Sequence, residues 1–199
     1  MRYLVVCGGK IDKEFGLNEI KTDGIDAIIA ADSGMDFLYE NGVTPDIIVG
    51  DFDSATTKAL EFFERKGQTE IHRLNPIKDD TDTEYAIRLA IREGARSIVL
   101  LGATGSRIDH VLGNISLLGI GLESKADISI IVTNNRIRMA DKPETIENSA
   151  QYGRFVSLIA VTDDNEVSLR GFKYPVTDYS FDRFTSLGIS NEIIDDHAV

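Results

Sequence analysis

Residues 97–118 read SIVLLGATGSRIDHVLGNISLL and contain the transition that decides the fold. The run Ser97–Leu101 is short, apolar and rich in β-branched residues, which is typical of a strand buried on both faces of a parallel sheet. Residues 102–107 then form a glycine-containing loop, and the pattern of residues 108–118 predicts a helix. A strand, a glycine loop and a helix in this order indicate an α/β domain.

The same alternation of strands and helices extends through the first 123 residues. Short apolar runs predict further buried strands at residues 3–7, 27–31, 46–49 and, more weakly, 69–74. Helical patterns lie between these runs, at residues 37–40, 58–66 and 84–93. Because parallel strands are joined by right-handed crossovers, we expect a parallel sheet with helices on both sides.

After residue 123 the pattern changes. Strand-like runs separated by turn residues follow one another, at residues 128–132, 155–161 and 166–169, and no good helical pattern accompanies them. This arrangement predicts a small antiparallel β domain. We therefore expect two domains, an α/β domain over residues 1–123 and a β domain over residues 124–199.

The chain is strongly acidic, with 33 Asp and Glu against 21 Lys and Arg and a formal net charge of −12. Sequence-independent nucleic-acid binding takes most of its affinity from basic side chains that neutralise phosphates, so this charge argues against it. It also argues against docking on an anionic membrane. Local phosphate binding through a metal ion or backbone N–H groups stays open.

Cys7 is the only cysteine, which excludes an internal disulfide and a thiolate metal cluster. We interpret it as a small buried hydrophobic residue, because the apolar run before it is too short for a signal peptide. No apolar run approaches the roughly 18 residues of a membrane-spanning helix. We expect a soluble cytoplasmic protein.

Acidic residues follow several of the predicted strands. Asp32 follows the second strand, and Asp51 and Asp53 follow the third. Three more come after the weaker strand candidate: Asp79, Asp80 and Asp82. Ligands of open α/β sheets bind at the carboxyl ends of the strands, and carboxylates that meet there repel one another unless a cation lies among them. Because oxygen ligands with few protein donors suit Mg²⁺, we predict a magnesium site.

Each acidic segment also has a structural interpretation. Asp32 and Ser33 could cap the following helix. Residues 81–84 read TDTE and match a capping box, and residues 50–54 read GDFDS and could form an exposed Asx turn. Capping explains Asp82 less well, because the acids around it exceed what one helix end can stabilise.

The loop at residues 102–107 reads GATGSR and leads into the predicted helix. Backbone N–H groups of a glycine turn at a helix start form an anion site, and Arg107 adds a bidentate phosphate donor. The alternative is a simple tight turn. His110 follows on the helix, where a surface or core histidine is as consistent with the sequence as a ligand.

Together, four segments resemble the thiamine pyrophosphokinases of bacterial type: residues 31–34 (ADSG), 45–54 (PDIIVGDFDS), 78–84 (KDDTDTE) and 102–114 (GATGSRIDHVLGN). Residues 185–192 (TSLGISNE) fit the same family. The resemblance covers essentially the whole chain in the order typical of the family, and the GDFDS and TGSRIDH runs are each specific. Chains of that family usually continue with another strand beyond the position of Val199.

The resemblance implies an activity and an architecture. The family transfers the terminal pyrophosphate of ATP to the hydroxyl of thiamine, which gives thiamine diphosphate and AMP. The implied architecture is a Rossmann-like parallel α/β domain that binds ATP and metal, followed by a small antiparallel β-sandwich that binds thiamine and dimerises. The active sites of the implied homodimer lie between its subunits.

The resemblance also implies roles for individual residues. Four aspartates would hold Mg²⁺: Asp32, Asp51, Asp53 and Asp82. Catalysis would depend on Asp51, Asp53, Asp82 and Arg107. The nucleotide or its phosphates would contact Lys78, Gly102, Thr104, Gly105, Arg107, Asp109, His110 and Asn114. Thiamine would lie near Ser186, Asn191 and Glu192.

Two other functions compete with this transferase. A metal-dependent phosphohydrolase would also use paired aspartates, but it leaves the loop at residues 102–107 unexplained. A nucleotide-sensing or thiamine-binding module would bind without turnover, which the full set of four aspartates argues against. Thiamine is cationic and aromatic, and in a chain without Trp its stacking partner would be Tyr179, Phe181 or Phe184.

Overall fold

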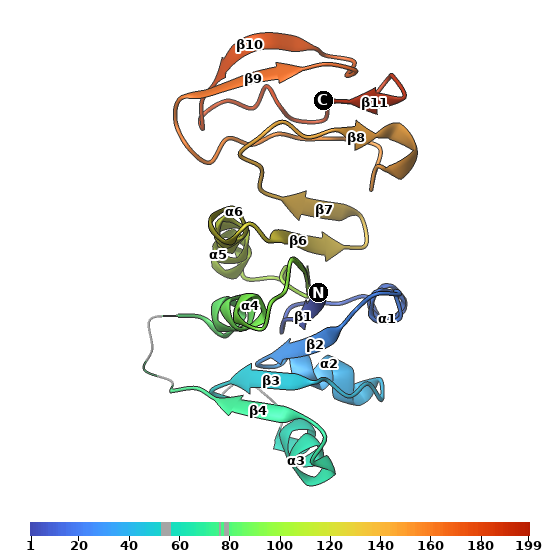
Figure 1. Ribbon diagram of the computed structural model, residues 1–199, viewed down its shortest axis with the longest axis vertical. Coiled ribbons are helices and arrows are strands. Elements are labelled where there is room, and N and C mark those ends of the chain that lie inside the picture. Colours follow the sequence, from blue (N-terminus) through green and yellow to red (C-terminus); the bar gives the residue numbers. More distant parts are fainter. Residues whose placement is uncertain (53–56, 76, 78–79) are drawn as a thin grey trace. The chain divides into compact units, whose positions relative to one another are not determined.

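The computed structural model describes residues 1–52, 57–75, 77 and 80–199. The chain divides into two compact units, Met1–Met139 and Ala140–Val199 (Figure 1). Asp53 and Lys78, which the resemblance assigns to the metal and the nucleotide, lie outside the described residues, as does Asp79.

The first unit is built on a sheet in which seven strands are described, in the order β4-β3-β2-β1-β5-β6-β7. Their bounds are β1 Arg2–Val6, β2 Ala27–Ala31, β3 Ile47–Gly50, β4 Glu70–Arg73, β5 Ser97–Leu101, β6 Asp127–Val132 and β7 Asn135–Arg138. Neighbouring strands from β4 to β6 pair in parallel, and β7 is antiparallel to β6. The five strands predicted for the α/β domain are confirmed, and the predicted bounds of β2 and β5 are the observed ones.

Helices cover both faces of this sheet (Figure 1). Their bounds are α1 Lys13–Ile20, α2 Gly34–Glu40, α3 Thr57–Lys66, α4 Asp82–Arg92, α5 Ile108–Leu117 and α6 Gly119–Ser124. Side chains of β1 alternate between two hydrophobic clusters, so that Tyr3 and Val5 pack with α4 while Leu4 and Val6 pack with α2 and α3. The expected parallel sheet with helices on both sides is confirmed.

Helix α1 is not predicted from the sequence, and Gly16 in its middle is the reason, because glycine lowers helix propensity. The structure shows two features that stabilise the helix. The Asp12 side chain caps it by accepting from the N–H of Phe15 at 2.9 Å. An added Cβ at Gly16 would lie 2.6 Å from the Ile11 side chain and 2.7 Å from the Phe37 ring, so glycine lets both side chains pack closely on the helix without shifting.

The strand predicted at residues 128–132 exists as β6, but its assignment to the antiparallel domain is wrong. It pairs in parallel with β5 and belongs to the main sheet, and β7 then closes a hairpin on it. The compact units divide after Met139, so the boundary expected after residue 123 is too early. An apolar run predicts a buried strand without showing which strand it pairs with.

The second unit contains small antiparallel sheets around its own core. Strands β9 (Asn165–Leu169) and β10 (Val176–Phe181) form one sheet, and β8 (Ile146–Glu147) and β11 (His197–Ala198) form the other, with a short 3₁₀ helix at Asn148–Ala150. Residues Leu169, Phe172, Ile193 and Ala198 are the buried core. The strand predicted at residues 166–169 is confirmed as β9.

The strand predicted at residues 155–161 is wrong. This segment makes a single β-bridge, between Val156 and Asn191, and is otherwise irregular. Phe155, Ile159 and Val161 are exposed, whereas Val156 and Leu158 between them are partly buried against the core of this unit, so only part of the apolar run faces the core. Among the described residues of both units, no helix combines the length and the apolar character that crossing a membrane requires.

Candidate active site

The order of the sheet reverses beside β1, and two loops meet at that point. Strands β2 to β4 extend to one side of β1, whereas β5 and β6 extend to the other. In open α/β sheets, the crevice outside the carboxyl ends of the strands at such a reversal binds ligands. The N–H of Gly9 donates to the carbonyl of Gly102 at 2.8 Å, and the N–H of Lys10 donates to the carbonyl of Thr104 at 3.2 Å. The loops after β1 and β5 are therefore joined.

This junction depends on glycine. An added Cβ at Gly9 would lie 2.2 Å from the carbonyl oxygen of Thr104, and Gly102 has a left-handed φ of 71°. Gly102 is one of the predicted site residues, whereas Gly9 and Lys10 are not among them. The pair of glycines directly after the first strand was the available signal, because close backbone approach at a strand exit is typical of phosphate-binding loops.

Three of the predicted metal ligands converge at this edge of the sheet. Asp32, Asp51 and Asp82 each offer one carboxylate oxygen, and these three atoms lie within 4.8 Å of one another. Asp32 follows β2, Asp51 follows β3, and Asp82 is the first residue of α4. Convergence of acids from separate strand exits is what the sequence predicts.

The donor set fits a hard divalent cation. All three ligands are carboxylate oxygens on partly buried side chains, and the Oδ1 atom of Asp32 is shielded from solvent. Three carboxylates leave further coordination positions for water or phosphate oxygens, an arrangement that Mg²⁺ prefers. We name Asp32, Asp51 and Asp82 the acidic cluster.

The backbone around Asp32 holds this residue against β3. Asp32 has a left-handed φ of 48°, which Asp tolerates better than most residues. Its N–H donates to the carbonyl of Val49 at 2.8 Å. Ser33 occupies the N-cap position of α2, but its hydroxyl makes no capping hydrogen bond, so the capping interpretation does not hold for Ser33.

The capping interpretation does hold at the start of α4. Thr81 is the N-cap residue, and its hydroxyl accepts from the N–H of Glu84 at 3.2 Å. The Glu84 carboxylate pairs with Arg88 at 2.8 Å. Capping by Thr81 and the place of Asp82 in the acidic cluster coexist, because the cap fixes the helix turn from which Asp82 projects.

A contact between α4 and β1 further fixes this turn. The Thr83 hydroxyl donates to the sulfur of Cys7 at 3.7 Å. Cys7 directly follows β1 and is buried, as the sequence predicts. Burial raises the pKa of the Cys7 thiol to about 11, although the hydrogen bond from Thr83 lowers it in part. The thiol is therefore neutral at physiological pH.

We expect the native protein to resist thiol labelling. At about pH 8, a thiol with the raised pKa of Cys7 is ionised roughly 100-fold less than a free cysteine, and burial slows attack further. Labelling with a chromogenic disulfide reagent tests this. The chain unfolded in guanidinium is the control and should label rapidly, with one equivalent. Equally rapid labelling of the native protein would contradict the burial of Cys7.

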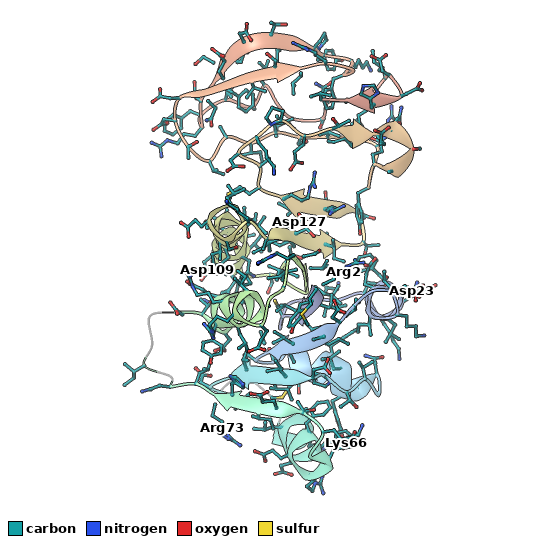
Figure 2. All side chains as sticks on the ribbon, viewed as in Figure 1. Arg2, Asp23, Lys66, Arg73, Asp109 and Asp127 are labelled. Carbon is teal, nitrogen blue, oxygen red and sulfur yellow. The ribbon has the colours of Figure 1, made fainter. Side chains whose placement is uncertain are left out.

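The predicted phosphate loop is exposed where it meets α5. The Arg107 guanidinium donates to both carboxylate oxygens of Asp109, from Nη2 at 2.7 Å and from Nε at 3.3 Å. This pairing lowers the pKa of Asp109 to about 2. Both side chains are exposed, and Figure 2 labels Asp109 on α5. The structure thus joins two predicted site residues, and a phosphate would compete with Asp109 for Arg107.

Two more predicted residues lie on α5. The Asn114 amide donates to the carbonyl of Ala103 at 2.7 Å and so holds the loop against the helix. His110 is exposed, which excludes a core histidine and leaves a surface residue or a ligand. Gly105 is exposed and Thr104 is partly buried, at the beginning of this loop.

The residues expected near thiamine all lie in the second unit. The buried Asn191 accepts from the N–H groups of Tyr174 and Glu192 and donates to the carbonyl of Tyr174, so its amide stabilises the local fold. Glu192 pairs with Lys173 at 2.9 Å and Arg154 at 3.0 Å, and these hydrogen bonds lower its pKa. Ser186 is exposed in a turn.

The aromatic residues considered for stacking differ in exposure. Phe181 is buried and packs near Gly188, where an added Cβ would lie 2.6 Å from its ring. Phe181 is therefore not available to stack on a ligand. Tyr179 and Phe184 are exposed, at 40% and 89% respectively.

Comparisons with known proteins agree with the motifs. Residues 21–132 match the thiamin pyrophosphokinase catalytic domain, and residues 143–199 match the vitamin B1 binding domain of the same family. The thiamine pyrophosphokinase of Bacillus subtilis is 35% identical over 167 residues, which cover 83% of this chain and 78% of that protein.

Solved structures of the family share the whole fold. A crystal structure of thiamine pyrophosphokinase from Bacillus subtilis superposes with a TM-score of 0.87 and 31% identity, covering 100% of this chain and 92% of that one. The crystal structure of a thiamin pyrophosphokinase from Geobacillus thermodenitrificans superposes with a TM-score of 0.81 and 30% identity. The match covers 100% of this chain and 91% of that one. With matches across both units, the resemblance seen in the motifs is confirmed, and the chain belongs to the thiamin pyrophosphokinase family.

Proposed function

We propose that this chain transfers the terminal pyrophosphate of ATP to the hydroxyl of thiamine, with AMP as the leaving group. The thiamine oxygen attacks the β-phosphorus in line, the bond from that phosphorus to the α-phosphate oxygen breaks, and the hydroxyl proton passes to a base. The observation that carries the proposal is the convergence of the acidic cluster at the strand exits, in a chain of this family.

Magnesium dependence is part of the proposal. Asp32, Asp51 and Asp82 would hold Mg²⁺, with Asp53 as a further ligand expected from the motif. When bound, such an ion would neutralise the negative charge of the phosphates, including the charge that develops on the leaving group. The chain's own contribution is to hold the three carboxylates close together against their mutual repulsion.

The loops beside β1 would bind the phosphates. Arg107 supplies a planar donor with two parallel N–H groups, and α5 begins directly after it with backbone N–H groups that have no partner within the helix. Gly102, Thr104 and Gly105 belong to this loop, and Asn114 holds the loop on α5 by donating to the carbonyl of Ala103. Lys78, Asp109 and His110 are expected to contact the nucleotide as the motif implies.

The second unit would bind thiamine and support a homodimer. Ser186 and Glu192 are the proposed thiamine contacts, with Asn191 shaping the segment between them, and exposed Tyr179 and Phe184 are candidates for stacking. A dimer with active sites between subunits is supported by large exposed apolar side chains of this unit, such as Phe155, Ile159 and Leu187.

We also infer that the reaction takes place in the cytoplasm. The free thiol of Cys7, the only cysteine, is compatible with a reducing compartment.

The reaction products test the proposed function. Incubation of the purified chain with ATP, Mg²⁺ and thiamine should give equimolar AMP and thiamine diphosphate, separated and quantified by chromatography. Addition of EDTA should abolish both products, and omission of thiamine should abolish AMP. Release of phosphate or ADP would instead indicate a hydrolase, and ATP binding without any turnover would indicate a sensor.

A further inference from the structure

Phe52 has an unusual backbone conformation next to the acidic cluster. It directly follows Asp51 and has a left-handed φ of 63°. Such a conformation is rare for a bulky aromatic residue and persists only where surrounding contacts hold it. The contacts that hold Phe52 therefore also help to fix the peptide that joins Asp51 to Phe52.

Part of the restraint comes from packing against β3. The Phe52 ring joins the hydrophobic cluster formed with α2 and α3. It also folds back over the end of β3, so that an added Cβ at Gly50 would lie 3.1 Å from the ring. Gly50 thus provides the space that the ring occupies.

The remaining restraint comes from Arg73 at the end of β4 (Figure 2). Its guanidinium lies over the Phe52 ring, 5.4 Å from the ring centroid. Arg73 pairs in register with Gly50, and the N–H of Leu74 donates to the carbonyl of Gly50 at 2.9 Å. The guanidinium also pairs with Glu64 of α3. The Arg73 guanidinium therefore contacts both the Phe52 ring and the Glu64 carboxylate.

We propose that Arg73 is a positioning residue for the acidic cluster. By covering the Phe52 ring, it keeps Phe52 in its left-handed conformation, and that conformation keeps Asp51 directed toward Asp32 and Asp82. If Phe52 relaxed to an extended backbone while its ring stayed packed, the peptide between Asp51 and Phe52 would turn, ψ of Asp51 would change with it, and the Asp51 carboxylate would shift relative to those of Asp32 and Asp82. The proposal rests on the metal-binding role of the cluster under the proposed function.

The expected consequence is weaker metal binding rather than a slower chemical step. When only a fraction of molecules holds the competent arrangement, the apparent dissociation constant rises by the inverse of that fraction. The loss of one partly exposed cation–π contact corresponds to about a three- to fivefold change. Because the left-handed conformation of Phe52 is itself strained, the competent and relaxed arrangements lie close in free energy, so metal binding should weaken by a factor of about this size, and kcat at saturating metal should stay within about twofold.

Direct Mn²⁺ binding, measured by electron paramagnetic resonance on the full chain without nucleotide, tests the proposal. Arg73→Met keeps the aliphatic stem but removes the cation, and its Mn²⁺ dissociation constant should rise three- to fivefold. Arg73→Lys keeps a cation and should recover part of the loss. Glu64→Gln is the matched control: the Gln side-chain oxygen can still accept a hydrogen bond from the guanidinium and hold it over the ring, while the charge of the ion pair is lost, so this variant should bind Mn²⁺ as the wild type does.

A double-mutant cycle separates this role from a direct contact between Arg73 and ATP. Phe52→Leu removes the ring, so Arg73→Met should have no further effect on Mn²⁺ binding in that background. An equal loss in both backgrounds, an unchanged dissociation constant in Arg73→Met, or a raised KM for ATP at saturating Mg²⁺ would overturn the proposal. Thermal unfolding without metal checks that each variant folds.

Asp51→Asn distinguishes the two levels of the argument. If Asp51→Asn leaves Mn²⁺ binding unchanged, the metal-binding role of the acidic cluster is wrong. If Asp51→Asn weakens binding and Arg73→Met does not, only the positioning role of Arg73 is wrong.

Discussion

Replacing Asp51 by Asn should lower turnover by about 100-fold or more while leaving the chain folded. Asp51 is one of three carboxylates whose oxygens lie within 4.8 Å of one another. Asn keeps the size of the side chain and one oxygen, but it removes the negative charge that a divalent cation needs. The loss should be partly recovered at high Mg²⁺, because a weakened site can still be filled by mass action.

The same substitution should not destabilise the protein without metal. Like charges at this separation repel by about 1–3 kcal/mol near a protein surface, so removing one of them relieves strain in the folded state. We expect the free energy of unfolding in EDTA to stay unchanged or to rise by up to about 1 kcal/mol. Loss of activity combined with retained stability is typical of a functional carboxylate rather than a structural one.

Steady-state kinetics across a Mg²⁺ titration, together with urea unfolding in EDTA, measure both effects. Asp23→Asn is the matched control, since Asp23 is exposed, precedes β2 and undergoes the same change of charge. Its turnover should stay within about twofold of the wild type. Near-wild-type turnover in Asp51→Asn would show that the acidic cluster is not the metal site.

The convergence of these acids could be predicted because it depends on a general property of parallel sheets. Continuous apolar runs mark the buried strands, and the carboxyl ends of parallel strands meet at one edge. Asp32 and Asp51 follow two such runs, so their proximity follows from strand direction alone. Asp82 could be added because capping signals mark the start of α4 at the same edge.

Other features depend on contacts that are distant in the sequence and could not be predicted. The run at Asp127–Val132 predicts a strand. Its pairing with β5 depends on which strand forms the edge of the sheet at that point, and the run itself does not show this. The Phe52 ring meets Arg73 only because β3 and β4 pair in register. No local pattern in the sequence indicates that contact.

The second unit shows a different limit of sequence patterns. Its short strands bury few residues, and large apolar side chains such as Phe155 and Ile159 stay exposed. Apolar character therefore does not by itself show that Val156 and Leu158 pack against the core while their apolar neighbours stay exposed. Asn191 resembles a ligand-binding residue in the motif, yet its amide is hydrogen-bonded to the backbone of Tyr174 and Glu192.

Replacing Gly34 by Ala should destabilise the first unit by about 3 kcal/mol. Gly34 opens α2 directly beneath the end of β1, and an added Cβ would lie 1.9 Å from the carbonyl oxygen of Val6 and 2.6 Å from its carbonyl carbon. Both are backbone atoms of a central strand, so no side chain can rotate to make room. Either β1 or α2 must shift.

Urea unfolding compared with that of Gly119→Ala measures this cost. Gly119 is the first residue of α6, and an added Cβ there would make an ordinary contact 3.6 Å from the Met139 sulfur. Alanine favours a helix over glycine, so Gly119→Ala should be neutral or stabilising by up to about 1 kcal/mol. A Gly34→Ala protein as stable as the wild type would contradict the close approach of α2 to β1.

Gly34→Ala should also weaken metal binding, because Gly34 lies two residues after Asp32. The N–H of Met35 donates to the carbonyl of Asp32 at 3.2 Å, so a shift of α2 away from β1 displaces Asp32 as well. The close approach of α2 to β1, which Gly34 permits, thus stabilises the packing of α2 on the sheet and keeps Asp32 near Asp51 and Asp82. Stability and metal affinity should therefore fall together in this variant, whereas in Asp51→Asn metal affinity should fall alone.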